Sequence, residues 1–262
     1  MSRPMIVALD HIGISASDLE AAVAAMERVL AHKAAHVDLA SDKHAVFRLD
    51  NMALELAAGA AGGLGAIAFE VRDAAGAFRE AERRALKPSS PIIRSNGATA
   101  VRLADSATCG VAIELIQHAG VRPSAPSLPT AAGAVTGLDH VVIRTTHPNR
   151  AAALYGARLG LDMRLDRTEP KWGSRLMFFR CGDLIVEIVH NLKDEPSDAP
   201  DRLWGLSWRV ADAELARARL KANGVDVSDV RPGRKPGTRV FTLRDGTLSV
   251  PTLMVEPSAP IG

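Results

Sequence analysis

Cysteine is scarce in this chain: only Cys109 and Cys181 occur among its 262 residues. Two cysteines cannot form the disulfide framework on which many small secreted domains depend. The scarcity therefore favours a chain that works in a reducing compartment, and we expect a cytoplasmic location.

Long apolar runs and a strong net charge are missing as well. No apolar stretch approaches the ~18 residues of a membrane-spanning helix, and the opening segment MSRPMIVALD lacks the apolar centre of a signal peptide. The formal net charge is only +2, so the bulk charge attracts neither nucleic acid nor an anionic membrane. These absences leave a small molecule as the expected partner, with no nucleic acid and no membrane.

A repeat organises the residues that are present. The segment GLDHVVIR echoes the earlier ALDHIGIS, and the interval from His11 to His140 nearly equals that from Glu55 to Glu187. The same order at a nearly constant offset is typical of a duplicated chain.

The repeat divides the chain into two domains, and each domain divides again into two modules of a strand, a helix and three strands. The predicted domains span residues 1–118 and 137–258, with a linker rich in Pro, Ala, Ser and Gly at 119–136. The predicted modules span residues 5–58, 64–118, 137–190 and 203–257, and their helices span 18–31, 73–86, 149–160 and 211–224.

One module alone is too small for a stable core. We therefore expect an α+β fold in which four βαβββ modules pair into two cup-shaped mixed-sheet domains with the helices outside. The linker favours pairing within each half, and the alternative joins the second module to the third.

Side chains alternate between the two faces of a strand. In LDHVVIR the apolar Val141 and Ile143 share the face opposite His140, and LDHIGIS places His11 in the same way. Because the apolar face suits the underside of a helix, we expect both histidines to face a cup.

The first strand of the fourth module follows the same rule. In WGLSWRV the bulky Leu206 and Trp208 lie opposite Gly205, Ser207 and Arg209. We expect Trp208 to belong to the core and the small or polar residues to line the cup.

Glutamate recurs near the end of three modules. Glu55, Glu114 and Glu187 each stand between two apolar residues, in ALELA, AIELI and IVEIV. An ionised glutamate is rarely buried without a partner. We therefore expect all three to face a cup, where a cation, a hydrogen-bond donor or water satisfies them.

The four βαβββ units, with LDH opening a module and Glu-Leu or Glu-Ile near its end, resemble the vicinal oxygen chelate superfamily. That superfamily includes glyoxalases, extradiol ring-cleaving dioxygenases, epimerases, fosfomycin-resistance transferases and bleomycin-binding proteins. The resemblance covers nearly the whole chain and implies a divalent metal held by the first and last strands of two paired modules. The matching positions that carry metal-binding side chains are His11, Glu55, Glu114, His140 and Glu187.

The chain departs from the pattern at Ala66, Gly205 and Leu253, which cannot coordinate a metal. Gly205 and Leu253 remove two of the three iron ligands of an extradiol dioxygenase, so we expect no catechol cleavage. Either pairing of the modules gathers three donors, so the resemblance implies one divalent metal (Mn, Fe, Mg or Zn), or none if the site has lost it. Without a metal, His140 and Glu187 remain as a catalytic acid–base pair.

Aromatic residues make up only 4% of the chain, and all three tryptophans and the one tyrosine lie in the second half. Small-molecule pockets are mostly apolar and aromatic with a few placed polar groups, so we expect the substrate in the second cup. The basic loop RPGRKPGTR suits a carboxylate or phosphate, although such loops are also common as solvated surface. The predicted substrate-binding residues are Trp172, Arg175, Trp204, Arg234, Lys235 and Arg239.

These features together predict an enzyme that acts on a small, anionic organic compound. A divalent metal or the His140–Glu187 pair would stabilise an enolate or oxyanion. The competing hypothesis is a non-catalytic protein that sequesters a small molecule, as the resemblance to bleomycin-binding proteins implies. The resemblance also leaves a homodimer open.

Overall fold

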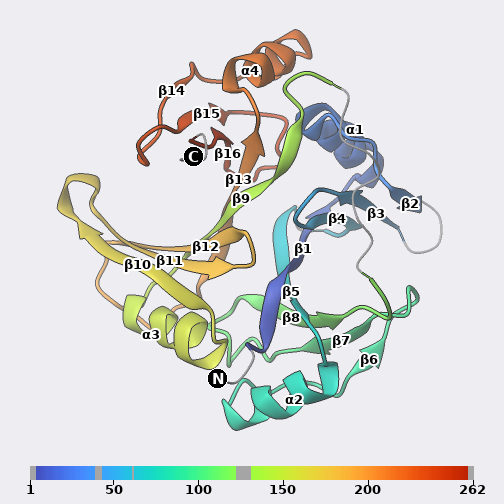
Figure 1. Cartoon of the computed structure of the whole chain (residues 1–262), viewed down its shortest axis with the longest axis vertical. Coiled ribbons are helices and arrows are strands. Elements are labelled where there is room, and N and C mark those ends of the chain that lie inside the picture. The colour runs from blue at the N-terminus through green and yellow to red at the C-terminus, as the bar shows by residue number, and fades with distance from the viewer. Residues whose placement is uncertain (1–3, 39–42, 61, 122–130, 259–262) are drawn as a thin grey trace. The chain divides into compact units, whose positions relative to one another are not determined.

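The computed structural model describes residues 4–38, 43–60, 62–121 and 131–258, which form four repeats of a strand, a helix and three strands (Figure 1). The first module contains β1 (Ile6–Ala16), α1 (Leu19–Leu30), β2 (His36–Asp38), β3 (His44–Arg48) and β4 (Ala53–Ala58). The second contains β5 (Gly63–Val71), α2 (Ala74–Arg83), β6 (Ile92–Ile93), β7 (Thr99–Arg102) and β8 (Ala112–Gln117).

The second half repeats this order. The third module contains β9 (Val135–Arg144), α3 (Pro148–Ala152), β10 (Asp162–Glu169), β11 (Ser174–Cys181) and β12 (Leu184–Asn191), with a π-helical turn at Ala153–Arg158 and a 3-10 turn at Pro170–Trp172. The fourth contains β13 (Arg202–Val210), α4 (Ala213–Ala222), β14 (Arg231–Pro232), β15 (Arg239–Leu243) and β16 (Thr252–Glu256).

Side chains at the helix starts explain where the helices begin. Asp18 accepts a hydrogen bond from the backbone N–H of Ala21 at 2.9 Å, which caps α1. In the fourth module the last strand also contributes a cap, because Glu256 accepts from the N–H of Ala213 at 2.8 Å. Gly224, after α4, has a φ of +77°, the left-handed conformation that the sequence predicts for a helix stop.

The strands form two mixed eight-stranded sheets. Their orders are β2-β3-β4-β1-β5-β8-β7-β6 and β10-β11-β12-β9-β13-β16-β15-β14. In the second sheet β13 and β16 are parallel, whereas β15 and β16 are antiparallel. The predicted α+β class and the pairing of four modules into two mixed sheets are confirmed, and the strands pair within each half.

Contacts also divide the chain into two compact units. The first unit contains residues 1–11, 65–122 and 141–204, and the second contains 12–64, 123–140 and 205–262. Each side-chain cluster below lies within one unit. The domain bounds drawn from the sequence, 1–118 and 137–258, stay predictions.

The start of the second half differs slightly from its predicted position. Residues 122–130 of the predicted linker lie outside the described residues. β9 begins at Val135, inside the predicted linker, where the N–H of Asp50 donates to the C=O of Thr136 at 3.3 Å. Composition alone does not reveal such a backbone bond, which extends the strand by a few residues.

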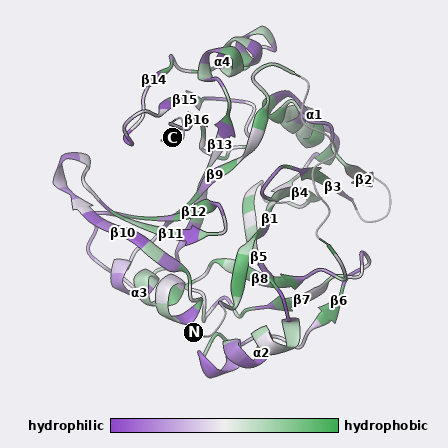
Figure 2. Ribbon diagram, in the orientation of Figure 1, coloured by the Kyte–Doolittle hydropathy of each residue, from purple (hydrophilic) through white to green (hydrophobic). Residues whose placement is uncertain are grey.

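The predicted alternation of faces is visible in β13. Leu206, Trp208 and Val210 are each no more than 3% exposed, so Trp208 is a core residue as predicted. The edge strand β10 is the opposite case, because all its residues except Glu169 are exposed and Figure 2 colours it mainly hydrophilic. Among the described residues no helix is long and apolar enough to cross a membrane.

Candidate active site

Two side chains hold the histidine of the second Leu-Asp-His segment. Nδ1 of His140 lies 2.8 Å from Oδ2 of Asp139, and Nε2 lies 2.7 Å from Oγ of Ser207. His140 belongs to β9 and Ser207 to β13, the neighbouring strand of the same sheet. Aspartate, histidine and serine are thus linked in series within one compact unit.

The carboxylate of Asp139 favours one tautomer of this histidine. Burial alone raises the pKa of a carboxyl, but the hydrogen bond from His140 and the positive charges nearby outweigh it, so the pKa of Asp139 lies below its ordinary value. One of these charges is Arg209, whose Nε lies 3.4 Å from Oδ1 of Asp139. A carboxylate beside Nδ1 favours the proton there, which leaves the Nε2 lone pair of a neutral imidazole to accept from the Ser207 hydroxyl.

The first Leu-Asp-His segment forms a different cluster. Nδ1 of His11 lies 2.7 Å from Oδ2 of Asp10, and the other carboxylate oxygen of Asp10 bonds Nε2 of His118. The side chain of Asp10 is only 8% exposed. Burial alone would raise its pKa, yet the hydrogen bonds and charges of the two histidines hold the pKa of Asp10 well below its usual range.

The three glutamates keep the alternation that the sequence predicts. Glu55, Glu114 and Glu187 are partly exposed, and the residues on either side of each are more deeply buried. Glu114 forms an ion pair with Arg94 and lies 3.9 Å from a second guanidinium, that of Arg102. Cations of the protein itself therefore satisfy this carboxylate.

The residues present do not fit a resident divalent metal. Among the residues that the structure describes, no three His, Cys, Asp or Glu side chains form a group that could hold a metal ion. Glu114 is already paired with two guanidinium groups, and Nε2 of His140 already bonds Ser207. An incoming cation would have to displace these partners and would meet the positive charge of Arg94 at Glu114. Metal binding by the five predicted donors stays a prediction.

The geometry of β13 explains why one expected ligand position is glycine. A Cβ atom on Gly205 would lie 2.9 Å from the carbonyl oxygen of Pro251, closer than a real Cβ can approach. Ser207, rather than Gly205, stands beside Leu253 in the parallel register of β13 and β16. The residue that meets His140 is therefore two positions further along the strand than the family pattern suggests.

The predicted aromatic residues lie beside arginines. The guanidinium of Arg167 lies 5.3 Å from the centroid of the Trp172 ring. The guanidinium of Arg144 lies 4.2 Å from the centroid of the Trp204 ring. Trp172 is partly exposed and Trp204 is exposed, as a binding role would need. Their part in substrate binding stays a prediction.

The predicted arginines differ in their partners. Arg175 forms a two-pronged pair with Asp166, at 2.9 and 2.7 Å, and the hydrogen bond with this carboxylate raises the pKa of Arg175. Arg239 pairs with Glu214 of α4 at 2.8 Å and with Glu256 at 3.2 Å. Both guanidinium groups are therefore engaged by carboxylates of the protein.

The remaining predicted residues belong to separate compact units. The exposed Arg234 and Lys235 share the second unit with His140, whereas Glu187 belongs to the first. The catalytic pairing of His140 with Glu187 therefore stays a prediction.

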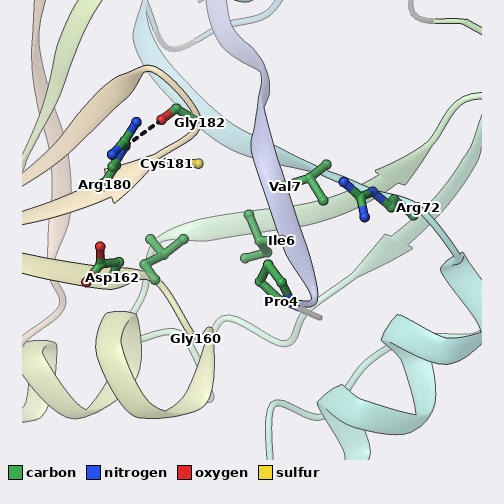
Figure 3. Close-up of a pocket in the computed structure, with 10 residues that line it drawn as sticks. Pro4, Ile6, Val7, Arg72, Gly160, Asp162, Arg180, Cys181 and Gly182 are labelled. Carbon is green, nitrogen blue, oxygen red and sulfur yellow. Dashed lines mark hydrogen bonds between the residues drawn. The ribbon is translucent and has the colours of Figure 1, made fainter. Parts of the chain in front are cut away.

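The first unit, which does not contain His140, has a cavity of about 250 Å³ (Figure 3). Its wall includes Ile6 and Val7 of β1, with Arg72 and Arg180 on opposite sides of these residues (Figure 3). None of the residues predicted for the site lines it. Arg180 of this cavity donates to the carbonyl oxygen of Gly182 at 3.1 Å. His140 remains the candidate centre, because there an imidazole is linked to both a carboxylate and a hydroxyl.

Sequence reasoning missed four residues that the structure brings to the two histidines: Asp10, His118, Asp139 and Ser207. The repeated aspartate was a visible signal, since both LDH segments carry it directly before the histidine. Alternation had also placed Ser207 on the polar face. His118 lies just after β8 and gives no such signal.

Comparisons with known proteins agree with this architecture. A family model described as "Glyoxalase/Bleomycin resistance protein/Dioxygenase superfamily" matches residues 139–242, a span that includes Asp139, His140 and Ser207. No curated protein matches the chain.

Solved structures share the fold over nearly the whole chain. The Mn(II)-bound glyoxalase from Novosphingobium aromaticivorans has a TM-score of 0.76 at 14% identity, over 97% of this chain and 83% of that chain. The 2,3-dioxygenase LapB from Pseudomonas sp. KL28 has a TM-score of 0.72 at 17% identity, over 98% and 94%. BphC, a halotolerant catechol dioxygenase, has a TM-score of 0.71 at 16% identity, over 96% and 87%. The resemblance that the sequence suggested is confirmed.

Proposed function

Because a family model of the glyoxalase, bleomycin resistance protein and dioxygenase superfamily matches residues 139–242, we propose that the chain is an enzyme acting on a small, anionic organic compound. His140 moves a proton at an acidic carbon of the substrate, and an enolate forms. This is general acid–base catalysis by a positioned imidazole, which contributes about 10²–10⁴-fold to a rate.

The hydrogen bonds of His140 carry this proposal. Asp139 holds Nδ1 at 2.8 Å and keeps the proton there, so Nε2 is the basic nitrogen. The hydroxyl of Ser207 occupies Nε2 at 2.7 Å and is the group that a substrate proton would replace. The imidazole side chain is 18% exposed, so part of the ring is accessible in the folded protein.

The compact unit that contains His140 also contains a basic loop, which suits an anion. Arg234 and Lys235 lie in the same compact unit as His140, and we propose that this loop holds the carboxylate or phosphate of the substrate. Arg239 is a weaker candidate, because Glu214 and Glu256 already neutralise it. We also propose that the predicted residues of the first unit, Glu187 among them, take part in this reaction.

No step of the proposed reaction passes through a metal. Two of the five predicted donors already have partners in the protein, since Glu114 pairs with arginines and His140 bonds Ser207. Ring cleavage of catechols is not proposed, because Gly205 and Leu253 stand where two iron ligands would be needed. The cytoplasmic location and a homodimer stay predictions.

Solvent deuterium exchange tests the proposal. The protein is mixed in deuterated buffer with a panel of small 2-oxo and 3-oxo carboxylic acids, and loss of the acidic C–H signal is followed by proton NMR. We expect the parent protein to accelerate exchange of at least one acid, and a His140→Gln variant to lose about 10²–10⁴ of that acceleration. A His44→Gln variant, which changes a histidine of the unrelated strand β3, controls for the substitution itself.

Two results would count against the enzyme. Exchange that is equally fast in the His140→Gln variant would assign the proton transfer to another group. Tight binding of an acid by the parent protein without any exchange would favour the competing hypothesis, a protein that only sequesters its ligand.

A further inference from the structure

We propose that Ser207 is a nucleophile that accepts an acyl group from small esters, which gives the chain a hydrolytic activity besides proton transfer. The inference rests on the proposed function in one respect, because it uses the same basic nitrogen of His140. It adds a covalent intermediate and a different substrate class.

The distances around His140 are those of an activated serine. An activated nucleophile needs its base within about 2.6–3.2 Å, and the base needs a third group that orients it. Oγ of Ser207 lies 2.7 Å from Nε2 of His140, and Nδ1 lies 2.8 Å from Oδ2 of Asp139. Unrelated folds reach this Asp–His–Ser series in different chain orders, so geometry rather than sequence position identifies it.

The strands hold the three groups rigidly. Asp139 and His140 are consecutive in β9, and Ser207 lies in β13, whose alternate side chains Leu206 and Trp208 are buried in the core. Arg209, two residues further along β13, keeps Asp139 ionised from 3.4 Å. A site on strands anchored by buried neighbours loses little entropy when it reacts.

Burial limits the acyl groups that can reach the serine. Ser207 is only 3% exposed, whereas the side chain of His140 is 18% exposed. An ester must therefore approach along the imidazole and present a slim carbonyl carbon. We infer that acetyl and similarly short acyl esters are the substrate class, and that branched or aromatic acyl groups are excluded.

The proposed reaction has two balanced steps. Oγ of Ser207 bonds the acyl carbon while its proton passes to Nε2 of His140, and the bond from carbon to the leaving alcohol oxygen breaks as that oxygen takes the proton. Water then adds to the acyl carbon and gives a proton to Nε2. The carbon–Oγ bond breaks, Ser207 regains the proton from His140, and the carboxylic acid leaves.

Acetylation by p-nitrophenyl acetate tests the inference. We expect a burst of nitrophenolate of about one equivalent per chain, the mass increase of one acetyl group on the intact protein, and that group on Ser207 by peptide mapping. A Ser207→Ala variant should lose the burst and at least about 100-fold of the hydrolysis rate. A Ser207→Cys variant should recover acetylation at the same position, which separates loss of the nucleophile from loss of structure. A Ser174→Ala variant is the matched control, because that serine donates only to the backbone carbonyl of Trp172.

Acetyl groups spread over lysines, or a burst that persists in the Ser207→Ala variant, would overturn the inference. So would the absence of any acetyl–enzyme in the parent protein. These failures are distinguishable from failure of the proposed function, because deuterium exchange of oxo acids is measured on the parent protein without an ester. Exchange without acetylation leaves the proton transfer standing and removes only the nucleophile.

Discussion

An Asp139→Asn variant is expected to stay folded while losing about 10²–10⁴ of the rate of proton transfer. The variant replaces the carboxylate, which accepts a hydrogen bond from Nδ1–H of His140, by an amide of the same shape. The amide can present its NH₂ group to Nδ1 of His140, which favours the proton on Nε2 instead. Nε2 then donates to Ser207 and is no longer basic.

The loss of stability in this variant should be small by comparison. Asp139 has a side-chain exposure of 28%, and its pairs with His140 and Arg209 are open to water on one side. We expect unfolding to become easier by about 1 kcal/mol, the usual net value of one hydrogen bond. Deuterium exchange and thermal unfolding, measured on the same preparation, give the two quantities.

An Asp105→Asn variant provides the control, since it also removes a carboxylate from an exposed pair with an arginine, Arg102. That variant should keep the parent rate. If Asp139→Asn exchanges protons as fast as the parent protein, the tautomer of His140 is not what makes the site basic, and the proposed function loses its main support.

The fold could largely be predicted from the sequence, because the chain contains a repeat. Each module places bulky residues at every second position of its first strand, and the structure buries them, as Leu206 and Trp208 demonstrate. A pattern of period two survives even where the sequence has diverged, since burial selects only for apolar character on one face. Three helices, α1, α2 and α4, likewise fall within a few residues of their expected bounds, whereas α3 ends at Ala152 and the chain continues as a π-helical turn to Arg158.

The site could be predicted only in part from the sequence, because its contacts depend on the register between strands. The sequence identified His11, His140 and the glutamates by alternation, which is a local property. It did not identify the meeting of His140 with Ser207, since β9 and β13 are far apart in the chain and the family pattern pointed to Gly205. A shift of two residues keeps a side chain on the same face, so alternation could not correct the alignment.

The pairing of Glu114 with Arg94 could not be predicted from the sequence, for a related reason. Arg94 follows the short strand β6, whose two isoleucines are both exposed and show no alternation of buried and exposed positions. A guanidinium from a neighbouring loop can therefore replace a metal ion beside a carboxylate without leaving a signal in the strand itself.

An Asp10→Asn variant is expected to lose about 3 kcal/mol of stability at neutral pH, the cost of removing one partner from a buried ion pair. Asp10 is the counterpart of Asp139 in the repeat, but it is only 8% exposed and it serves both His11 and His118. We therefore expect the repeated motif to contribute stability in the first half and, in the proposed function, proton transfer in the second. Proton transfer should therefore be unchanged in Asp10→Asn at temperatures where the variant is folded.

The pH dependence of unfolding separates this ion pair from ordinary packing. The pKa of Asp10 is lowered in the folded protein. As the pH falls, the unfolded chain, whose aspartate pKa is about 3.9, therefore binds the proton at a higher pH than the folded protein does. The stabilisation is therefore complete above about pH 5 and is lost as the pH falls through the unfolded and then the folded value. Urea unfolding between neutral and acidic pH should show the parent and Asp10→Asn curves converging in acid. Curves that remain parallel down to pH 3 would mean that Asp10 stabilises the fold by its shape rather than by its charge.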